Sequence, residues 1–302
     1  MSEKVTLVIK PLEPLMLRSS GEFDIETKGP ASYAKSLLIP RPSTIAGMLA
    51  SLLYKGVVKE NWIDEVKENM KPINEICGPL LVKENYAYVP LRIGGVFTLI
   101  KAPLDKLSES IRDKIYDIIK FYKDEDKEKI DYNKIDTEIS ELTREDLSPV
   151  VFIQPRLGIG LDRDKKVTKE GMLYIANYVS IDAEIHVILT GDKNEIKKAL
   201  DGKIAFLGGE GRIVKLSILD KETFNCSKNT NNGILLSPLP VNKADKFIGE
   251  LGIIGMGFDI RNKKRKEIVK AVLEGSIVIS ANPITKYNVL GYGSQITLNL
   301  GC

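Results

Sequence analysis

Three glycines and an arginine lie together in the stretch AFLGGEGRIVKL, residues 205–216. Gly208, Gly209 and Gly211 leave a bare backbone that another chain can approach, and Arg212 can hold a phosphate through charge-assisted hydrogen bonds. A P-loop needs a lysine and a Ser or Thr before a helix, and a Rossmann fingerprint opens a helix. This stretch leads into alternating apolar residues, which predict a strand, so a mononucleotide site is disfavoured. Two interpretations stay open: a tight turn, or a surface for an extended phosphate chain.

Two further arginines stand where an anion can bind. Arg18 lies in a loop of serine and glycine just after the first predicted strand. Arg41 directly precedes a predicted helix, where free N–H groups and the helix dipole favour an anion. Ser43 or Thr44 is expected to cap that helix. The alternatives are an ordinary surface arginine at position 18, and prolines beside Arg41 that only stiffen the helix entry.

A third candidate is a long hairpin with a charged tip, GIGLDRDKKVTKEGMLY, residues 158–174. Basic residues of such a tip can lie along a phosphate backbone or between nucleotides. Acidic residues in the same tip largely cancel its charge, so a solvated tip is the alternative. The flanking glycines and the basic residues of the tip are Gly158, Gly160, Arg163, Lys165, Lys166 and Lys169.

The titratable inventory argues against several classes of enzyme. The single histidine, His186, sits in an alternating segment that predicts a strand, and we expect no catalytic role for it. Cys77, Cys226 and Cys302 are far apart without a CxxC, so neither a disulfide framework nor a zinc site is expected. The net charge of +3 means that any nucleic-acid surface is a local patch. No run approaches the roughly 18 apolar residues of a membrane span, and no signal peptide is seen, so a cytoplasmic protein without membrane contact is expected.

The secondary-structure elements that must position these residues are predicted from hydrophobic periodicity and from the residues that cap or break helices and strands. Period-two runs predict strands and a 3.6-residue apolar stripe predicts helices. Asp192 is expected to cap the second short helix, which stops at Gly202. In chain order the predicted elements are a strand at 4–12, a helix within 41–56, strands within 86–100, a helix at 108–122, the hairpin, a strand at 182–191, a helix within 192–202 and a strand at 212–219.

The order strand, helix, strand, strand, helix, strand is that of a split βαβ, ferredoxin-like fold. We therefore expect an α+β protein with two such domains in tandem. The first, residues 1–220, carries insertions and the long hairpin near 156–180, and the second, smaller one covers 221–302. LGYGSQ before the closing strand echoes LGGEGR and supports this duplication. The charge-dense segment 123–146 and the basic run 261–266 have no assigned role.

Four motifs together carry a resemblance to a known family. PLEPLMLRSSGEF, PRPSTIAGML, GIGLDRDKKVTKEGMLY and LGGEGR occur in that order along the chain. This ordered set resembles the RAMP superfamily of CRISPR RNA-binding proteins and, within it, the family of third subunits of type III-B (Cmr) effector complexes. The resemblance spans nearly the whole chain.

The resemblance implies a non-catalytic scaffold subunit in antiviral defence, without cofactor or metal. Such a subunit holds the 5′ tag of the crRNA and contacts the large polymerase-like subunit and the backbone RAMP subunits. Splayed tag bases would stack on aromatic rings, for which Tyr174, Tyr178 and Tyr292 are candidates and equally candidates for the core. The implied RNA contacts are Arg18, Arg41, Ser43, Gly158, Gly160, Arg163, Lys165, Lys166, Lys169, Gly208, Gly209, Gly211 and Arg212.

A metal-independent endoribonuclease that processes CRISPR transcripts on the same fold is the alternative. Such an enzyme needs a general base or acid near the 2′-hydroxyl, often a histidine. The one histidine lies within a predicted strand between apolar neighbours, although a Tyr/Lys pair can substitute for it. The sequence therefore disfavours this alternative but does not exclude it.

Overall fold

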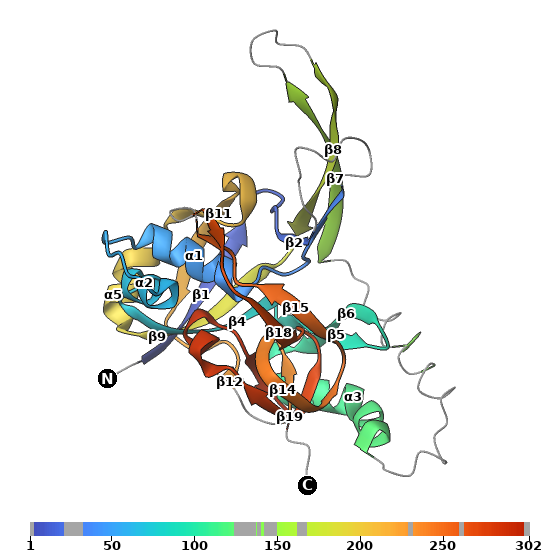
Figure 1. The fold of residues 1–302 in the computed structure, drawn as a ribbon. Coiled ribbons are helices and arrows are strands. Elements are labelled where there is room, and N and C mark those ends of the chain that lie inside the picture. Colours follow the sequence, from blue (N-terminus) through green and yellow to red (C-terminus); the bar gives the residue numbers. More distant parts are fainter. Residues whose placement is uncertain are drawn as a thin grey trace.

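The computed structural model describes residues 3–20, 33–123, 137, 140–141, 150–161, 168–228, 232–259 and 263–298. These residues form two seven-stranded sheets, helices packed on them, and a long hairpin that projects from the body (Figure 1). The α-helices are α1 Pro42–Leu52, α2 Trp62–Asn69, α3 Leu107–Lys123 and α5 Lys193–Leu200, and the short 3-10 helices are η1 Leu104–Lys106, η3 Gly209–Gly211 and η4 Thr285–Leu290. The α+β class is confirmed.

The first sheet is antiparallel throughout. In spatial order its strands are β10 Ile204–Phe206, β11 Ile213–Leu219, β1 Glu3–Pro11, β9 Glu184–Gly191, β4 Ile73–Lys83, β5 Tyr86–Ile93 and β6 Val96–Pro103. The helices α1 and α5 lie in the chain between β1 and β4 and between β9 and β11. Each buries an apolar stripe in the main core, Ile45 and Leu49 from α1 and Ile196 and Leu200 from α5.

The second sheet is also antiparallel and contains strands from beyond residue 226 only. In spatial order its strands are β12 Ser227–Lys228, β20 Ser294–Thr297, β13 Gly233–Leu235, β19 Ile277–Pro283, β14 Leu239–Ile248, β18 Ile268–Val272 and β15 Leu251–Gly255. A separate short hairpin, β16 Phe258–Asp259 with β17 Lys264–Arg265, connects β15 to β18.

The part of the chain after β11 differs from the expected second ferredoxin-like domain. Its described residues contain strands and η4 but none of the α-helices that such a domain requires. Helix α3 takes their place, because Ile111 and Ile115 pack in one core cluster with Ile234 and Ile277 of the second sheet. The helix that packs on the second sheet therefore comes from the first part of the chain. The periodicity of residues 221–302 cannot reveal this packing.

The long hairpin is confirmed, with β7 Val151–Leu161 paired antiparallel to β8 Thr168–Ile181. Near its base β8 also pairs in parallel with β3 Tyr33–Ser36, which pairs with β2 Arg18–Ser20. This four-stranded sheet links the hairpin to the loop after β1. The rest of the hairpin extends away from the body in Figure 1.

Local signals succeed and fail for identifiable reasons. Asp192 caps α5 as expected, its side chain accepting the Glu195 N–H at 3.0 Å. The cap of α1 was predicted wrongly: Arg41 is the N-cap residue without a side-chain cap bond, and proline occupies the first helical position, where its missing N–H costs nothing. Helix α2, capped by Asn61 through the Ile63 N–H at 2.9 Å, had no prediction.

The prediction on cysteines was also wrong. Cys77 of β4 and Cys226, just before β12, form a disulfide across 149 residues of sequence. The partners lie far apart in sequence, and only the packing of the two sheets brings them together. This bond joins the first sheet to the entry of the second. None of the helices in the described residues has both the length and the apolar character needed to cross a bilayer.

Candidate nucleic-acid interface

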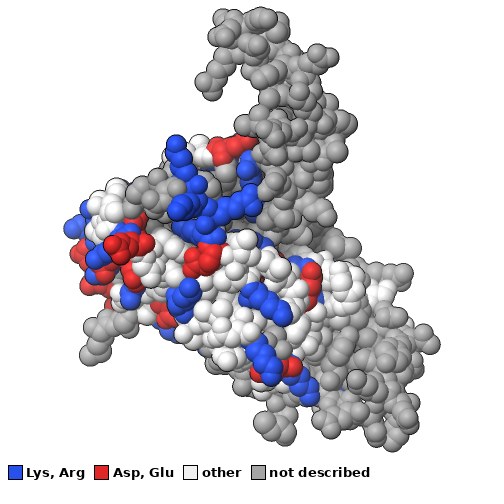
Figure 2. All heavy atoms as spheres, in the orientation of Figure 1, with Lys and Arg blue, Asp and Glu red and all other residues white. Residues whose placement is uncertain are grey.

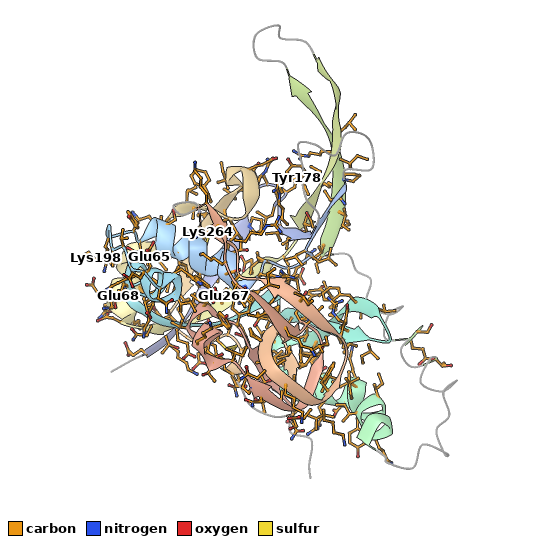
Figure 3. All side chains as sticks on the ribbon, viewed as in Figure 1. Glu65, Glu68, Tyr178, Lys198, Lys264 and Glu267 are labelled. Atoms are coloured by element: carbon orange, nitrogen blue, oxygen red, sulfur yellow. A yellow bond between two sulfur atoms is a disulfide. The ribbon has the colours of Figure 1, made fainter. Side chains whose placement is uncertain are left out.

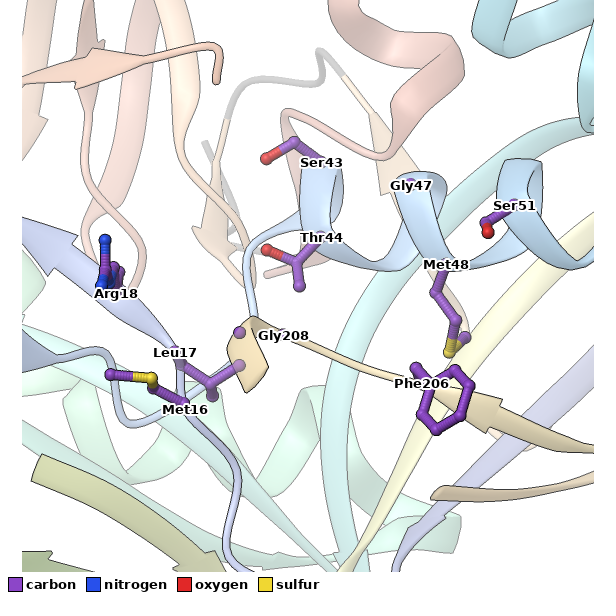
Figure 4. Close-up of a pocket in the computed structure, with 11 residues that line it drawn as sticks. Met16, Leu17, Arg18, Ser43, Thr44, Gly47, Met48, Ser51, Phe206 and Gly208 are labelled. Carbon is purple, nitrogen blue, oxygen red and sulfur yellow. The ribbon is translucent and has the colours of Figure 1, made fainter. Parts of the chain in front are cut away.

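A cavity of about 400 Å³ opens where the start of β2, helix α1 and the glycine loop meet. The predicted residues Arg18, Ser43, Gly208 and Gly209 all line it, although they come from three segments spread over 190 residues of sequence (Figure 4). The structure thus brings four of the predicted RNA contacts to one place. Met16 and Leu17 form part of the wall on the β2 side.

Helix α1 presents small and hydroxyl-bearing residues to this cavity. Ser43, Gly47 and Ser51 recur at a spacing of four, which places them on one face of the helix, and Thr44 lies beside them. Gly47 is exposed, and a Cβ built on it would meet no atom within 4 Å. This part of the wall is therefore thin and polar.

The glycine loop connects β10 to β11 and packs against the protein itself. Gly208 has φ 81° and ψ −162°, a conformation essentially restricted to glycine. A Cβ there would lie 2.5 Å from the Met16 carbonyl oxygen, and the Gly209 N–H donates to that oxygen at 2.9 Å. Gly211 is also left-handed, at φ 62°. The glycines therefore permit the close approach of the Met16 backbone. Gly208 and Gly209 also line the cavity.

Arg212 is engaged within the protein. Its Nη1 donates to Oε2 of Glu13 at 2.8 Å and its Nη2 to Oε2 of Glu210 at 2.9 Å, and 17% of its side chain is exposed. Its guanidinium lies 4.5 Å from the ring centre of Tyr178. The Glu13 carboxylate, and then that of Glu210, raise the pKa of Arg212, and the bond from the Ile213 N–H, followed by that from Arg212, lowers the pKa of Glu13. Arg212 holds the loop against the segment after β1.

Tyr178 ties the hairpin to the same cluster. Its hydroxyl donates to Glu210, which sits at φ 60° between the loop glycines. Burial and this bond raise the pKa of Tyr178, and the same bond lowers the pKa of Glu210. The guanidinium of Arg156 also lies over the ring, at 4.7 Å. Tyr178 is buried, so it positions the base of β8 and offers no open face to a nucleobase.

The other predicted contacts either lie away from this cavity or fall outside the described residues. Gly158 and Gly160 lie in β7, where Gly158 pairs with Tyr174. Lys169 lies in β8. The tip residues Arg163, Lys165 and Lys166 fall outside the described residues.

Arg41 stays at the entry of α1, half-buried, and does not line the cavity. Burial raises the pKa of the Tyr292 phenol, against the smaller lowering effects of a hydrogen bond with Ser43 and of the Arg41 charge. Tyr292 is fully buried, so it belongs to the core and not to a stacking surface.

Sequence reasoning missed the aromatic residue that does line the cavity. Phe206, at the end of β10, is 65% exposed. It stands two residues before Gly208, and β10 is an edge strand of the first sheet. The signal that could have found it is an aromatic residue two positions before the first loop glycine.

His186 lies in β9 as expected, buried, with its Nδ1 3.0 Å from the Thr223 hydroxyl and its Nε2 3.4 Å from Glu184. Burial lowers its pKa, which favours the neutral ring. Within the described ranges no group of histidine, cysteine and carboxylate side chains is arranged to hold a metal ion.

The sequence and the fold are similar to those of CRISPR effector proteins. Residues 7–113 and 133–237 match the family described as CRISPR-associated protein Cas_Cmr3. The chain is 32% identical to the CRISPR system CMR subunit Cmr3 of Saccharolobus solfataricus, over 97% of this chain and 96% of that one. It superposes with a TM-score of 0.73 and 30% identity on a chain of the type III-B Cmr-beta complex bound to cognate target RNA and AMPPnP, covering 95% and 94% of the two chains. A second Cmr-beta structure with cognate target RNA gives 0.73 and 29%, with 97% and 96% covered.

Proposed function

This chain belongs to the Cmr3 family of CRISPR-associated proteins, and we propose that it is a non-catalytic, crRNA-binding scaffold subunit of a type III-B (Cmr) effector complex. In this role it works in the cytoplasm in antiviral defence. It holds the 5′ tag of the crRNA, docks the large polymerase-like subunit and contacts the backbone RAMP subunits. The likeness to chains of RNA-bound Cmr-beta complexes supports the proposal.

The first sheet supports a ferredoxin-like core for this subunit. Four of its strands lie in the order β11-β1-β9-β4, and the helices α1 and α5 follow β1 and β9 in the chain. This is the strand–helix–strand–strand–helix–strand arrangement of a split βαβ unit. We assign residues 1–220 to this unit and the second sheet to 221–302.

One observation carries the RNA-binding proposal: the cavity that joins Arg18, Ser43 and the glycine loop. A single-stranded tag needs a cation for its phosphates, hydroxyl and backbone groups for its sugar and base edges, and an aromatic ring for stacking. Arg18, Ser43 and Phe206 supply these three groups around one cavity. Arg212 acts indirectly, by fixing the loop that forms the wall.

The long hairpin is the second part of the proposed RNA surface. Its basic residues Arg163, Lys165, Lys166 and Lys169 would meet the phosphate backbone beyond the cavity. The bond from Tyr178 to Glu210 joins the base of the hairpin to the glycine loop. Gly158 and Gly160 would let the RNA backbone lie close to β7.

We propose that the RNA is held and not cleaved. His186 is buried in the first sheet with a lowered pKa, and its ring nitrogens face Thr223 and Glu184. It does not line the cavity at the glycine loop. Incubation of the purified protein with repeat RNA in EDTA tests this point, because discrete cleavage at one position would favour the endoribonuclease.

For the large subunit we assign the open face of β15 and β18. Ile253 and Ile268 are 77% and 63% exposed and border a shallow groove of about 300 Å³. β15 is an edge strand of the second sheet in the described residues, and its exposed isoleucine is typical of a protein contact. Ile253→Asp should abolish co-purification of the large subunit and leave tag affinity unchanged.

The RNA-binding proposal is tested at Gly47, where a side chain has open space. Gly47→Glu places a negative charge in the cavity wall, and Gly47→Lys places a positive charge of similar size there. Both replace a helical glycine, so neither should lower the melting temperature. Gly47→Glu should weaken binding of tag-bearing single-stranded RNA by about tenfold or more, whereas Gly47→Lys should not weaken it.

Arg18→Ala tests the phosphate contact, with the exposed Lys198→Ala on α5 as a control for loss of charge. The arginine variant should lower both the affinity and the salt dependence of binding, by a slope of about 0.7 per lost phosphate contact. If the Gly47→Glu variant and the Arg18→Ala variant both bind RNA as tightly as the wild type, the proposed RNA path is refuted.

A further inference from the structure

A second cavity, of about 270 Å³, lies against α1 and shares a wall with the first. Ser43, Thr44 and Gly47 line both cavities. The second cavity is completed by Trp62 of α2 and by Lys266, which follows β17. The first two turns of α1 thus separate the glycine loop from a site built on an aromatic ring and a cation.

One residue of the basic run that had no assigned role, Lys266, lines this second cavity. The short hairpin β16–β17 carries Lys264 and Arg265, and Lys263 and Lys266 flank β17. The first three are exposed, and Lys263 turns the chain at φ 51°. We call residues 263–266 the basic arm. Figure 3 labels Lys264 beside α1, and a group of Lys and Arg side chains gathers on this face in Figure 2.

Trp62 is held in a fixed orientation. Its Nε1–H donates to Oε2 of Glu267 at 3.1 Å. Oε1 of the same carboxylate accepts from the Tyr287 hydroxyl at 3.1 Å and pairs with Lys286 at 3.1 Å. Burial raises the pKa of Glu267, but a bond from its own backbone N–H, followed by those from Trp62, Lys286 and Tyr287, outweighs burial and brings the pKa to about 2. The ring is therefore anchored through its edge by a permanently charged carboxylate.

A lysine side chain lies over the Trp62 ring. The Lys266 Nζ lies 4.1 Å from the ring centre. Such a contact contributes on the order of 0.5–1 kcal/mol at an exposed site, so a stacking base can displace it. A displaced lysine stays within reach of the phosphate of the same nucleotide. Ring and cation together are the pair of groups that single-stranded nucleic-acid sites use.

We propose that single-stranded RNA crosses α1 from the glycine loop into this second cavity, where one base stacks on Trp62 and the basic arm holds its phosphates. The inference rests on the proposed function and extends it, since it adds an RNA-contacting site built from α2 and the short hairpin β16–β17. RNA is favoured over an acidic protein segment because the two cavities share one wall and because an aromatic ring faces the cation.

The chain offers a direct probe, because Trp62 is its only tryptophan. Titration of the full-length protein with tag-bearing RNA should quench the tryptophan fluorescence, with the same midpoint as binding measured by anisotropy of a labelled RNA. Abasic substitution at successive tag positions should remove the quenching at one position. Unchanged fluorescence at saturating RNA would overturn the inference.

Variants give a second readout. Trp62→Ala should lower RNA affinity about five- to 150-fold, the range for loss of one stacked base, and Trp62→Phe should restore most of it. Lys266→Gln, which leaves the ring in place, should lower affinity and the salt slope together. Its melting temperature is measured in parallel, so that a folding defect is recognised.

The outcomes separate this inference from the function on which it rests. If Arg18→Ala and Gly47→Glu weaken binding while the Trp62 and Lys266 variants bind as wild type, the function stands and the second site is wrong. If none of the four changes binding, both are wrong. If the Trp62 and Lys266 variants bind RNA normally but lose a protein subunit from the complex, this surface binds a protein and the inference is overturned.

Discussion

The glycine loop allows a sharp test, because two adjacent glycines differ in what a side chain would meet. Gly208 has φ 81° and ψ −162°, where any other residue costs about 1–3 kcal/mol. A Cβ there would also lie 2.5 Å from the Met16 carbonyl oxygen, and forcing an atom into a packed space costs about 1–3 kcal/mol more. Gly208→Ala should therefore lower the free energy of unfolding by at least about 2 kcal/mol.

Gly209→Ala is the matched control. Gly209 has no positive φ, and its Cβ would lie 3.3 Å from the Met16 sulfur, a flexible side-chain atom that can move. Its cost should stay below about 1 kcal/mol. At about 2–4 °C per kcal/mol, Gly208→Ala should melt at least about 4 °C lower than wild type and clearly below Gly209→Ala.

Thermal melting followed by circular dichroism, with urea titration to obtain the free energy, measures this difference. Equal melting temperatures for Gly208→Ala and Gly209→Ala would refute the reasoning, because only Gly208 has a positive φ and only its Cβ would clash with a backbone atom. A large loss for Gly209→Ala would mean that the Met16 side chain cannot move. Either result would require a different account of how this loop is fixed.

Three further predictions concern stability. Cys226→Ser removes the bond to Cys77 and should lower the free energy of unfolding by about 2–5 kcal/mol in urea titration. A reducing agent should lower the stability of the wild type by a similar amount and leave that of the variant unchanged. Arg212→Ala should lower the melting temperature, because it releases the loop from Glu13 and Glu210, and Arg212→Lys should recover only part of this loss. Burial lowers the pKa of His186, so below about pH 6.5 the unfolded chain binds a proton that the folded chain does not. Stability should therefore decrease as the pH is lowered through this range. His186→Gln should make stability less dependent on pH in urea titrations between pH 7.5 and 5.5.

The elements with strong local signals were predictable. The period of α3, the Asp192 cap of α5 and the alternation of β1, β9 and β11 depend on neighbours in sequence, so the sequence contains their cause. Strand β4 escaped prediction because Gly78 and Pro79 interrupt it, and the register of β4 against β9 shifts between Cys77 and Leu80 to accommodate them. The helix cap at Arg41 was missed because proline competes with a serine cap for the same turn.

The candidate site was only partly predictable. Its members Arg18, Ser43, Gly208 and Gly209 were chosen for residue type, which is a property of the sequence. Arg212 and Tyr178 were chosen in the same way, yet the structure pairs Arg212 with Glu13 and covers the Tyr178 ring with guanidinium groups. Type alone cannot say whether a charge is already neutralised by a partner from another segment.

By itself, the sequence determined the α+β class, the long hairpin, the glycine loop before β11 and the ordered motifs of the family, because each is encoded within a short stretch. Only the tertiary structure decided that Cys77 meets Cys226, that α3 covers the second sheet, and that Trp62 and the basic arm stand across α1 from the glycine loop. The disulfide, the packing of α3 and the contact of Lys266 with Trp62 each join residues more than about 100 positions apart. They are fixed by how two sheets share their cores, which no local pattern records.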